Sequence, residues 1–155
     1  MANIAQSVNV ISPLMTTKDG IVKQTTWWPL LLFSKYMRGH TVGVHVSCAE
    51  YEGPTEPAWL RGTCETPWLD VSASIGDDGW VSMAVVNVHE SQGFKTRVDG
   101  IVSSKVDVYI VSGESVDVVN TEQKQEVGIE ERKWDGKGLF EFPKHSLTML
   151  RWQVD

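Results

Sequence analysis

The side chains best suited to catalysis in this chain are carboxylates, which gather in two stretches. Four glutamates lie between residues 50 and 65 and three lie between residues 126 and 131, namely Glu50, Glu52, Glu56, Glu65, Glu126, Glu130 and Glu131. Paired carboxyl groups can act as general acid and general base. Charged residues are mostly exposed in folded proteins, however, so we expect both groups to be solvated surface carboxylates. We therefore assign no catalytic residue to this chain.

Nitrogen and sulfur ligands for a metal ion are also poorly placed. None of the four histidines lies three or four residues from another, and no Cys-x-x-Cys pair accompanies them. We predict no metal and no cofactor. His145 stands in the stretch Phe-Pro-Lys-His-Ser, where a structural role is the expectation. The two cysteines, Cys48 and Cys64, could form a disulfide or remain buried thiols.

Tryptophan is the unusually frequent residue type. The seven tryptophans are spread over the whole chain, at Trp27, Trp28, Trp59, Trp68, Trp80, Trp134 and Trp152. Most such side chains pack in a core or against a neighbouring domain. Stacking on a sugar ring is the alternative, and the number of tryptophans does not separate the two.

Length and charge limit the kind of protein and the kind of partner. The chain has 155 residues, enough for one domain or for one domain and a piece of another. Its net charge of −6, without clustered lysines and arginines, argues against a nucleic-acid partner. No apolar run approaches the roughly 18 residues that a membrane helix needs. The first residues have no basic region followed by an apolar one, so they are not a signal peptide.

The first forty residues differ in pattern from the rest. Residues 4–11 are β-branched and apolar with polar residues between, which predicts a strand. Lys18-Asp19-Gly20 is a turn signal. An amphipathic helix is predicted from about Thr26 to Met37, with Pro29 in its first turn and Gly39 just past its end. A strand followed by a helix is one β/α unit, which needs neighbours on both faces.

Alternating apolar residues dominate after residue 41. Such runs occur at residues 42–46, 69–73, 81–88, 106–110 and 147–152, with glycine-containing turns between them. Short strands at regular spacing predict a mainly β fold, an antiparallel β-sandwich of jelly-roll type. The boundary with the first segment falls near Gly39.

Four ordered stretches carry a resemblance to a known family. They are Ala5–Pro13, Gln24–Pro29, Leu69–Ala73 together with Ala84–Asn87, and Phe142–Thr148. In order and spacing they resemble the C-terminal portion of the fungal-type α-L-arabinofuranosidases of glycoside hydrolase family 51. The resemblance covers nearly the whole chain.

This resemblance implies a parent enzyme made of a (β/α)₈ barrel followed by a β-sandwich. Residues 1–40 would then be the last strand and helix of the barrel, and residues 41–155 the C-terminal sandwich domain. The family releases terminal α-L-arabinofuranosyl groups from arabinoxylan, arabinan and related oligosaccharides, outside the cell and with retention of configuration. Retention requires two carboxyl groups about 5 Å apart. In the family both are glutamates on earlier barrel strands, so we expect this chain to be inactive without the barrel.

Two polar residues are the candidates for contact with a sugar. Active-site residues of barrels lie at the C-terminal ends of strands, and Gln6 is in such a place. The resemblance implies that Gln6 hydrogen-bonds the bound arabinofuranose, for which an amide offers donors and an acceptor. Asn9 belongs to the same motif, although it could instead support a turn.

A stand-alone carbohydrate-binding module is the alternative function. Such a module needs two or three aromatic side chains in one plane on one exposed face, so the placement of the tryptophans separates the two hypotheses. Without a barrel, the predicted helix should either lie against the sandwich or leave an apolar patch of several hundred Å².

Overall fold

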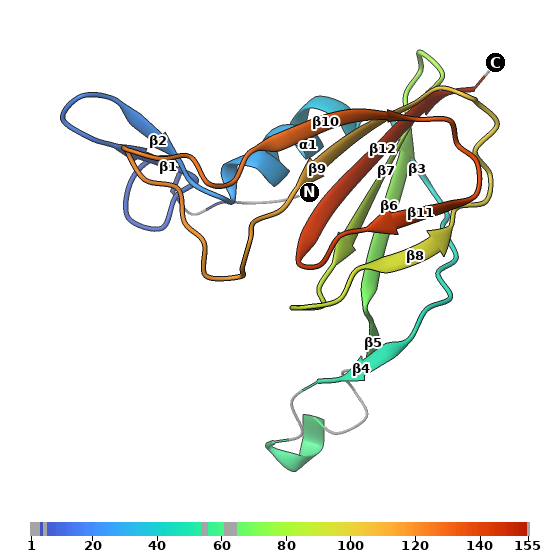
Figure 1. Ribbon diagram of the computed structural model, residues 1–155, viewed down its shortest axis with the longest axis horizontal. Helices are drawn as coiled ribbons and strands as arrows, with labels where there is room; N and C mark the ends of the chain where they lie inside the picture. Colours follow the sequence, from blue (N-terminus) through green and yellow to red (C-terminus); the bar gives the residue numbers. More distant parts are fainter. Residues whose placement is uncertain (1–3, 5, 54–55, 61–64, 155) are drawn as a thin grey trace.

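The computed structural model describes residue 4 and residues 6–53, 56–60 and 65–154. One six-stranded sheet dominates it, with helix α1 on one face and a two-stranded sheet on the other (Figure 1). The elements are β1 (Leu14–Thr16), β2 (Ile21–Lys23), α1 (Trp27–Tyr36), β3 (His40–Val42), β4 (Glu50–Glu52), η1 (Ala58–Leu60), β5 (Glu65–Pro67), β6 (Leu69–Ile75), β7 (Trp80–Asn87), β8 (Phe94–Arg97), β9 (Val106–Val111), β10 (Ile129–Trp134), β11 (Leu139–Phe142) and β12 (Ser146–Gln153).

The large sheet is antiparallel throughout, with strand order β10-β9-β12-β7-β6-β3. The central strand β12 pairs with β7 from Ser146 opposite Asn87 to Gln153 opposite Trp80. β8 and β11 form the second sheet. The prediction of an antiparallel β-sandwich is confirmed.

Side chains alternate between the two faces of the large sheet, and each face has its own core. One core lies between the two sheets and contains mainly β-branched and aromatic residues, among them Val85, Val106, Val108, Phe140, Phe142 and Leu150. The other lies under the helix, where Trp28 and Leu32 of α1 pack with Leu147 and Met149 of β12. Both Met149 and Leu150 have no exposed surface, because strand β12 separates the two cores.

Helix α1 begins where the sequence predicts and lies against the sheet. Thr26 is its N-cap residue, and Pro29 falls in the first turn, where a backbone N–H has no helical partner to lose. Past its end, Gly39 has a φ of 91°, and a Cβ there would lie 2.2 Å from the carbonyl oxygen of Ile75. Glycine is therefore required to turn the chain from the helix into β3. Of the two arrangements expected for the helix, the structure has the one in which the sandwich covers it.

A cation and three aromatic rings hold the last turn of α1 on the sheet. The guanidinium of Arg151 lies 4.1 Å from the ring centroid of Tyr36 and 4.6 Å from that of Trp80. The hydroxyls of Tyr36 and Tyr109 are 3.2 Å apart. Burial opposes ionisation of Tyr36, but hydrogen bonds with Lys35 and Tyr109 and the charges of Lys35 and Arg151 lower its pKa. Burial and the neighbouring Tyr36 raise the pKa of Tyr109.

The strand predicted over residues 4–11 is not formed. The described part of this stretch has one isolated bridge, between Val8 and Leu14, and no strand. Asn9 and Val10 have φ values of 63° and 60°, so the chain turns instead of staying extended. Strand β1 follows this turn and pairs with β2 around the predicted turn at residues 18–20, where Thr17 N–H donates to Gly20 O at 2.8 Å.

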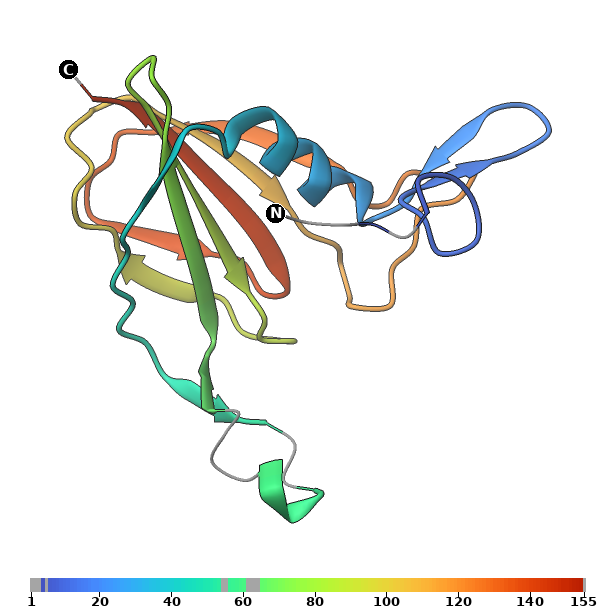
Figure 2. The same ribbon diagram turned by 180° about the vertical axis from the view of Figure 1, so that it is seen from behind.

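An arm that contains the described residues 50–53, 56–60 and 65–67 projects from the sandwich (Figures 1 and 2). Its two strands β4 and β5 pair with each other and with no other described strand. At its root the rings of Tyr51 and Trp68 are 4.5 Å apart, and His89 stacks on Trp68 at 4.3 Å. Cys48, just before the arm, is a free thiol packed against the inter-sheet core, whereas Cys64 lies outside the described residues.

No helix in the described part of the chain is long and apolar enough to cross a membrane.

Replacing Leu32 with alanine tests the packing of α1 on the sheet. Leu32 is 1% exposed, so its truncation leaves a cavity between the helix and β12. We expect Leu32→Ala to lower the free energy of unfolding by about 2–5 kcal/mol in urea denaturation. Ser34→Ala, on the exposed side of the same helix, is the control and should change it by less than about 0.5 kcal/mol. Equal stabilities for the two variants would contradict the docked helix.

Candidate functional site

Gln6 is exposed and lies before the bridge at Val8, outside any strand of the described chain. The sequence predicts it at the end of a barrel strand, but this stretch pairs with a single neighbour at a single position. The structure therefore leaves its side chain open to a ligand or to another domain. No contact brings Gln6 and Asn9 together in the described residues.

Asn9 organises a turn. Its carboxamide oxygen Oδ1 accepts the backbone N–H of Thr16 at 2.7 Å and the Thr16 hydroxyl at 3.0 Å. Its own N–H donates to Leu14 O at 2.7 Å, and its carbonyl oxygen accepts Ser12 N–H at 3.1 Å. Asparagine tolerates the left-handed backbone that this position has. These bonds fit the alternative reading of Asn9 as a residue that shapes the loop carrying Gln6.

The first two sequence motifs are hydrogen-bonded to each other. The side chain of Gln24 donates to Ser12 O at 2.8 Å, and its backbone N–H donates to Pro13 O at 2.9 Å. Gln24 O in turn accepts the N–H of Trp27 at the start of α1, at 3.0 Å. Ser12 is 1% exposed, so this junction is buried. The segment with Gln6 and Asn9 is thereby tied to the helix.

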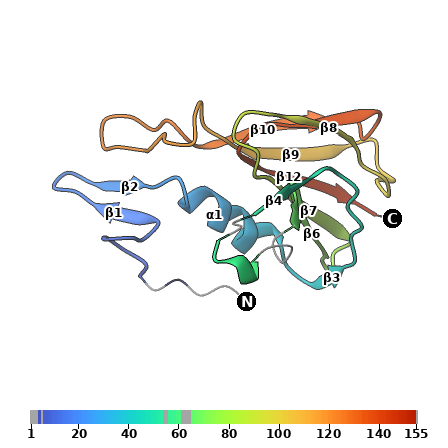
Figure 3. The ribbon, with the colours of Figure 1, turned by 90° about the horizontal axis from the view of Figure 1, so that it is seen from below.

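A long loop of the sandwich holds the same segment from the other side. Residues 112–128, between β9 and β10, run beside the β1–β2 hairpin (Figures 1 and 3). Asn120 donates through Nδ2 to Lys23 O at 2.9 Å and to Val127 O at 2.8 Å. Glu122 accepts the hydroxyl hydrogen of Thr17 at 2.7 Å. The loop therefore joins the amino-terminal hairpin to the sandwich through polar contacts.

Two apolar hollows flank the start of α1. One, of about 540 Å³, lies between the helix and the sheet and is lined by Thr25, Phe33, Val86, Val111, Val118 and His145, among others. The second, of about 390 Å³, is lined by Ile4, Ile11, Pro13, Thr26, Pro29 and Leu30. Ile11 is 77% exposed, unusually much for a large apolar residue in a hollow. This surface is apolar enough to take another protein segment.

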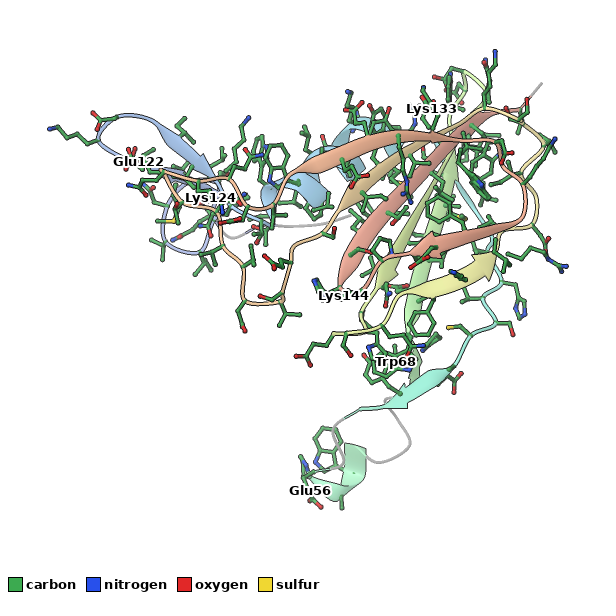
Figure 4. All side chains as sticks on the ribbon, in the orientation of Figure 1. Glu56, Trp68, Glu122, Lys124, Lys133 and Lys144 are labelled. Carbon is green, nitrogen blue, oxygen red and sulfur yellow. The ribbon has the colours of Figure 1, made fainter. Side chains whose placement is uncertain are left out.

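Of the seven carboxylates singled out from the sequence, the five whose side chains the structure describes lie at the surface, whereas the side chains of Glu52 and Glu65 lie outside the described part. Glu50, Glu56, Glu126, Glu130 and Glu131 are exposed. Glu126 lies 2.6 Å from the ammonium of Lys124, the lysine labelled in Figure 4, and this hydrogen-bonded partner raises the pKa of Lys124. Exposed pairs of this kind contribute little to stability. Among the described residues no group of three or more His, Cys, Asp or Glu side chains could hold a metal ion.

The tryptophans do not form an exposed platform. Trp28 and Trp152 are buried, and Trp27, Trp68, Trp80 and Trp134 are partly buried. Trp68 already stacks with Tyr51 and His89. Trp59, near the end of the arm, is 75% exposed and is the single exposed tryptophan of the seven. The row of coplanar aromatic side chains that a carbohydrate-binding module needs is not found in the described structure.

Asn87 is a buried hydrogen-bonding centre whose role the sequence pattern did not reveal. It is 1% exposed, and its Nδ2 lies 2.9, 3.2 and 2.8 Å from the carbonyl oxygens of Gln92, Phe142 and Pro143, which share its two N–H groups. Its Oδ1 accepts the N–H of His89 at 2.9 Å. The signal that could have revealed it is a polar residue at the end of an otherwise apolar strand.

Comparison with known sequences identifies the family. The sequence model of the α-L-arabinofuranosidase C-terminal domain matches residues 1–146. The chain is 63% identical over 154 residues to the probable α-L-arabinofuranosidase C of Aspergillus terreus, and 60% identical over 154 residues to α-L-arabinofuranosidase C of Emericella nidulans. Each match covers 99% of this chain and 30% of the relative, so the chain spans about three tenths of the length of these curated relatives.

Solved structures agree with the sequence relatives. An α-L-arabinofuranosidase from Thermotoga maritima, in complex with arabinose, matches 97% of this chain with a TM-score of 0.80 and 26% identity. The GH51 arabinofuranosidase of Xanthomonas axonopodis pv. citri matches 99% with a TM-score of 0.78 and 27% identity. The chain covers 33% and 31% of those two proteins.

Fold and matches together define a β-sandwich domain of the kind found in glycoside hydrolases. The chain belongs to the α-L-arabinofuranosidase C-terminal domain family, within the α-L-arabinofuranosidases of glycoside hydrolase family 51.

Amide exchange at Thr16 tests the turn built by Asn9. Asn9→Gly keeps the left-handed backbone accessible but removes the acceptor, so we expect the Thr16 N–H to lose its protection and exchange about ten-fold faster or more. Asn9→Asp keeps the acceptor and is the matched control, which should leave exchange nearly unchanged. If the Thr16 N–H of Asn9→Gly exchanges as slowly as in the unmutated chain, the side chain of Asn9 does not stabilise the turn.

Proposed function

We propose that this chain is the C-terminal part of a retaining α-L-arabinofuranosidase that releases terminal arabinofuranosyl groups from arabinoxylan, arabinan and related oligosaccharides outside the cell. The observation that carries the proposal is the 63% identity over 99% of the chain to a protein named as an α-L-arabinofuranosidase. The exposed position of the five glutamates whose side chains the structure describes supports a division of labour in which the catalytic carboxyl groups belong to another part of the enzyme.

Retaining hydrolysis explains why that division is needed. One carboxyl group attacks the sugar and the other first protonates the leaving oxygen and then activates water, and the two stand about 5 Å apart across the scissile bond. The acid must keep its proton near neutral pH, which requires burial or a close negative neighbour. Glu126 instead pairs with a lysine in solvent, and Glu130 and Glu131 lie on the exposed strand β10.

The amino-terminal forty residues are proposed to complete a catalytic barrel. The segment before the turn at Asn9 would gain pairing partners beyond the single bridge at Val8 from neighbouring barrel strands. Ile4, Val10 and Ile11 are 49%, 73% and 77% exposed. Packing of a barrel over this segment would bury these apolar side chains. In this account residues 41–155 support the barrel from one side, and α1 connects the two.

Gln6 is proposed to contact the bound arabinofuranose. It is exposed, it precedes the turn that Asn9 holds in place, and its carboxamide can both donate to and accept from sugar hydroxyls. Asn9 is proposed to act in the same site chiefly by shaping this loop. An independent binding module needs two or three exposed aromatic side chains in one plane. A single tryptophan is exposed, so the described structure does not favour that alternative.

Activity of the chain by itself tests the division of labour. Because no catalytic carboxyl pair is assigned here, the purified 155-residue chain should hydrolyse an aryl α-L-arabinofuranoside no faster than buffer does. Release of the aryl group is followed by absorbance. Turnover that disappears when one of the acids in this chain is replaced would overturn the proposal.

Gln6→Ala in the full-length enzyme tests the sugar contact. Loss of the hydrogen bonds should cost ~1–3 kcal/mol in the transition state, which lowers kcat/KM about ten- to one-hundredfold with little change in melting temperature. Asn87→Ala is the contrasting variant, since it removes a buried hub and should lower stability more than turnover. If Gln6→Ala keeps full kcat/KM but melts several degrees lower, Gln6 has a structural role and does not contact the sugar.

A further inference from the structure

The sandwich loop 112–128 is organised around the side chain of Asn120. The loop connects β9 to β10 without a helix or strand of its own, and loops of this length inside a compact domain are usually functional. Oδ1 of Asn120 accepts the backbone N–H groups of Glu126 and Val127 at 2.9 and 2.8 Å. Nδ2 donates to Val127 O at 2.8 Å and to Lys23 O at 2.9 Å. All four hydrogen-bonding positions of the carboxamide are therefore used.

These four partners fix both the orientation and the place of the carboxamide. Two of them can only donate and two can only accept, so a flipped amide would set like groups against each other. Val127 is 6% exposed and packs with Trp28 and Leu32 in the core under α1. Asn120 is thus fastened to the sandwich on one side, and its remaining N–H reaches the amino-terminal hairpin.

The β1–β2 hairpin needs such support because it is small. Its strands pair at three positions, from Leu14 opposite Lys23 to Thr16 opposite Ile21, and an isolated two-stranded hairpin is at best marginally stable in water. Asn120 holds the base of the hairpin at Lys23 O. Glu122, labelled beside the hairpin in Figure 4, accepts the Thr17 hydroxyl at 2.7 Å near the turn. The loop therefore holds the hairpin at two points.

The hairpin in turn fixes the segment that carries Gln6. Leu14, the partner of Lys23, accepts the N–H of Asn9 at 2.7 Å and forms the bridge with Val8. Gln6 lies two residues before Val8 in the sequence. A continuous series of hydrogen-bonded neighbours thus runs from Asn120 through Lys23 and Leu14 to the segment before the turn.

We propose that Asn120 is a positioning residue of the sugar site, which sets the place of Gln6 through the β1–β2 hairpin. This inference rests on the proposed function, because the contact of Gln6 with arabinofuranose is itself a proposal. It gives the sandwich a part in substrate binding beyond supporting one side of a barrel. A small displacement of a group that binds the substrate can lower the rate strongly, so the hold of a distant loop matters for turnover.

Amide exchange in the 155-residue chain tests the hold on the hairpin without any assay of activity. Asn120→Ala removes the donor to Lys23 O, so the N–H groups of Asn9 and Thr17, which donate to Leu14 O and Gly20 O, should exchange about ten-fold faster or more. Amides in the middle of β12 should keep their protection. Thr121→Ala is the matched control and should change neither set, since the Thr121 hydroxyl bonds Lys124 inside the same loop and no described hairpin residue. Unchanged hairpin amides in Asn120→Ala would overturn the inference.

Asn120→Asp separates the hold on the hairpin from the shape of the loop. A carboxylate still accepts the N–H groups of Glu126 and Val127 but has no hydrogen for Lys23 O. The Val127 amide should stay protected while the hairpin amides exchange as fast as in Asn120→Ala. Hairpin amides that stay protected in Asn120→Asp would show that the bond to Lys23 does not hold the hairpin, and the inference would fail.

A double-mutant cycle in the full-length enzyme tests whether Asn120 acts through Gln6. With an aryl α-L-arabinofuranoside, Asn120→Ala should lower kcat/KM about three- to tenfold, and Thr121→Ala should leave it unchanged. In enzyme that already carries Gln6→Ala, the same Asn120→Ala replacement should lower kcat/KM by less than about twofold, because the group that it positions is gone.

The outcomes of this cycle keep the two proposals apart. Equal losses from Asn120→Ala with and without Gln6 would show a general structural effect and overturn the positioning role. A Gln6→Ala enzyme with full kcat/KM would overturn the sugar contact and the positioning role that rests on it, whereas the exchange result for the hairpin would still stand.

Discussion

The apolar contact between helix α1 and the six-stranded sheet is the interaction on which the amino-terminal forty residues depend. Trp28 and Leu32 are buried against Leu147 and Met149, and strand β12 buries its other side against the second sheet. A single helix and a few short strands cannot bury enough surface to fold alone, because conformational entropy opposes each ordered residue. Once docked, the helix positions the loops at both of its ends, including the one that carries Gln6.

Polar contacts refine what this packing establishes. The hairpin that precedes α1 is held by Asn120 and Glu122, which belong to a loop of the sandwich more than ninety residues further along the chain. Asn87 donates to the carbonyl oxygens of Gln92 and Pro143, and the ring of His145 contacts those of Glu90 and Gly113, so these side chains fasten neighbouring connections. Buried acceptors without partners are costly, so these side chains determine one arrangement of the loops. In the proposed enzyme, this rigidity would keep the sugar-contact segment at the mouth of a barrel.

The parts of the fold that sequence predicted are those with a local signal. Strands β6, β7, β9 and β12 alternate apolar residues, and α1 combines a threonine at the N-cap position with helical spacing, so each was predicted near its true place. Strand β10 was missed because Glu130–Lys133 are charged and lie on an exposed edge. Residues 4–11 have the composition of a strand, but strand pairing is a tertiary property, and Asn9 and Val10 turn the chain. The candidate site could be predicted as a motif only, because the bonds of Asn9 to Thr16 and of His145 to Gly113 join residues by folding and not by spacing.

We expect α1 and the sandwich to unfold as one unit, which keeps the amino-terminal segment in place. Native-state hydrogen exchange in low concentrations of denaturant tests it most directly, by comparing amides in the middle of α1 with amides in the middle of β12. Both sets of amides should exchange through global unfolding, with the same free energy and the same dependence on denaturant. If the helix amides exchange through a separate opening several kcal/mol below that of β12, the helix is only loosely attached and the claim is contradicted.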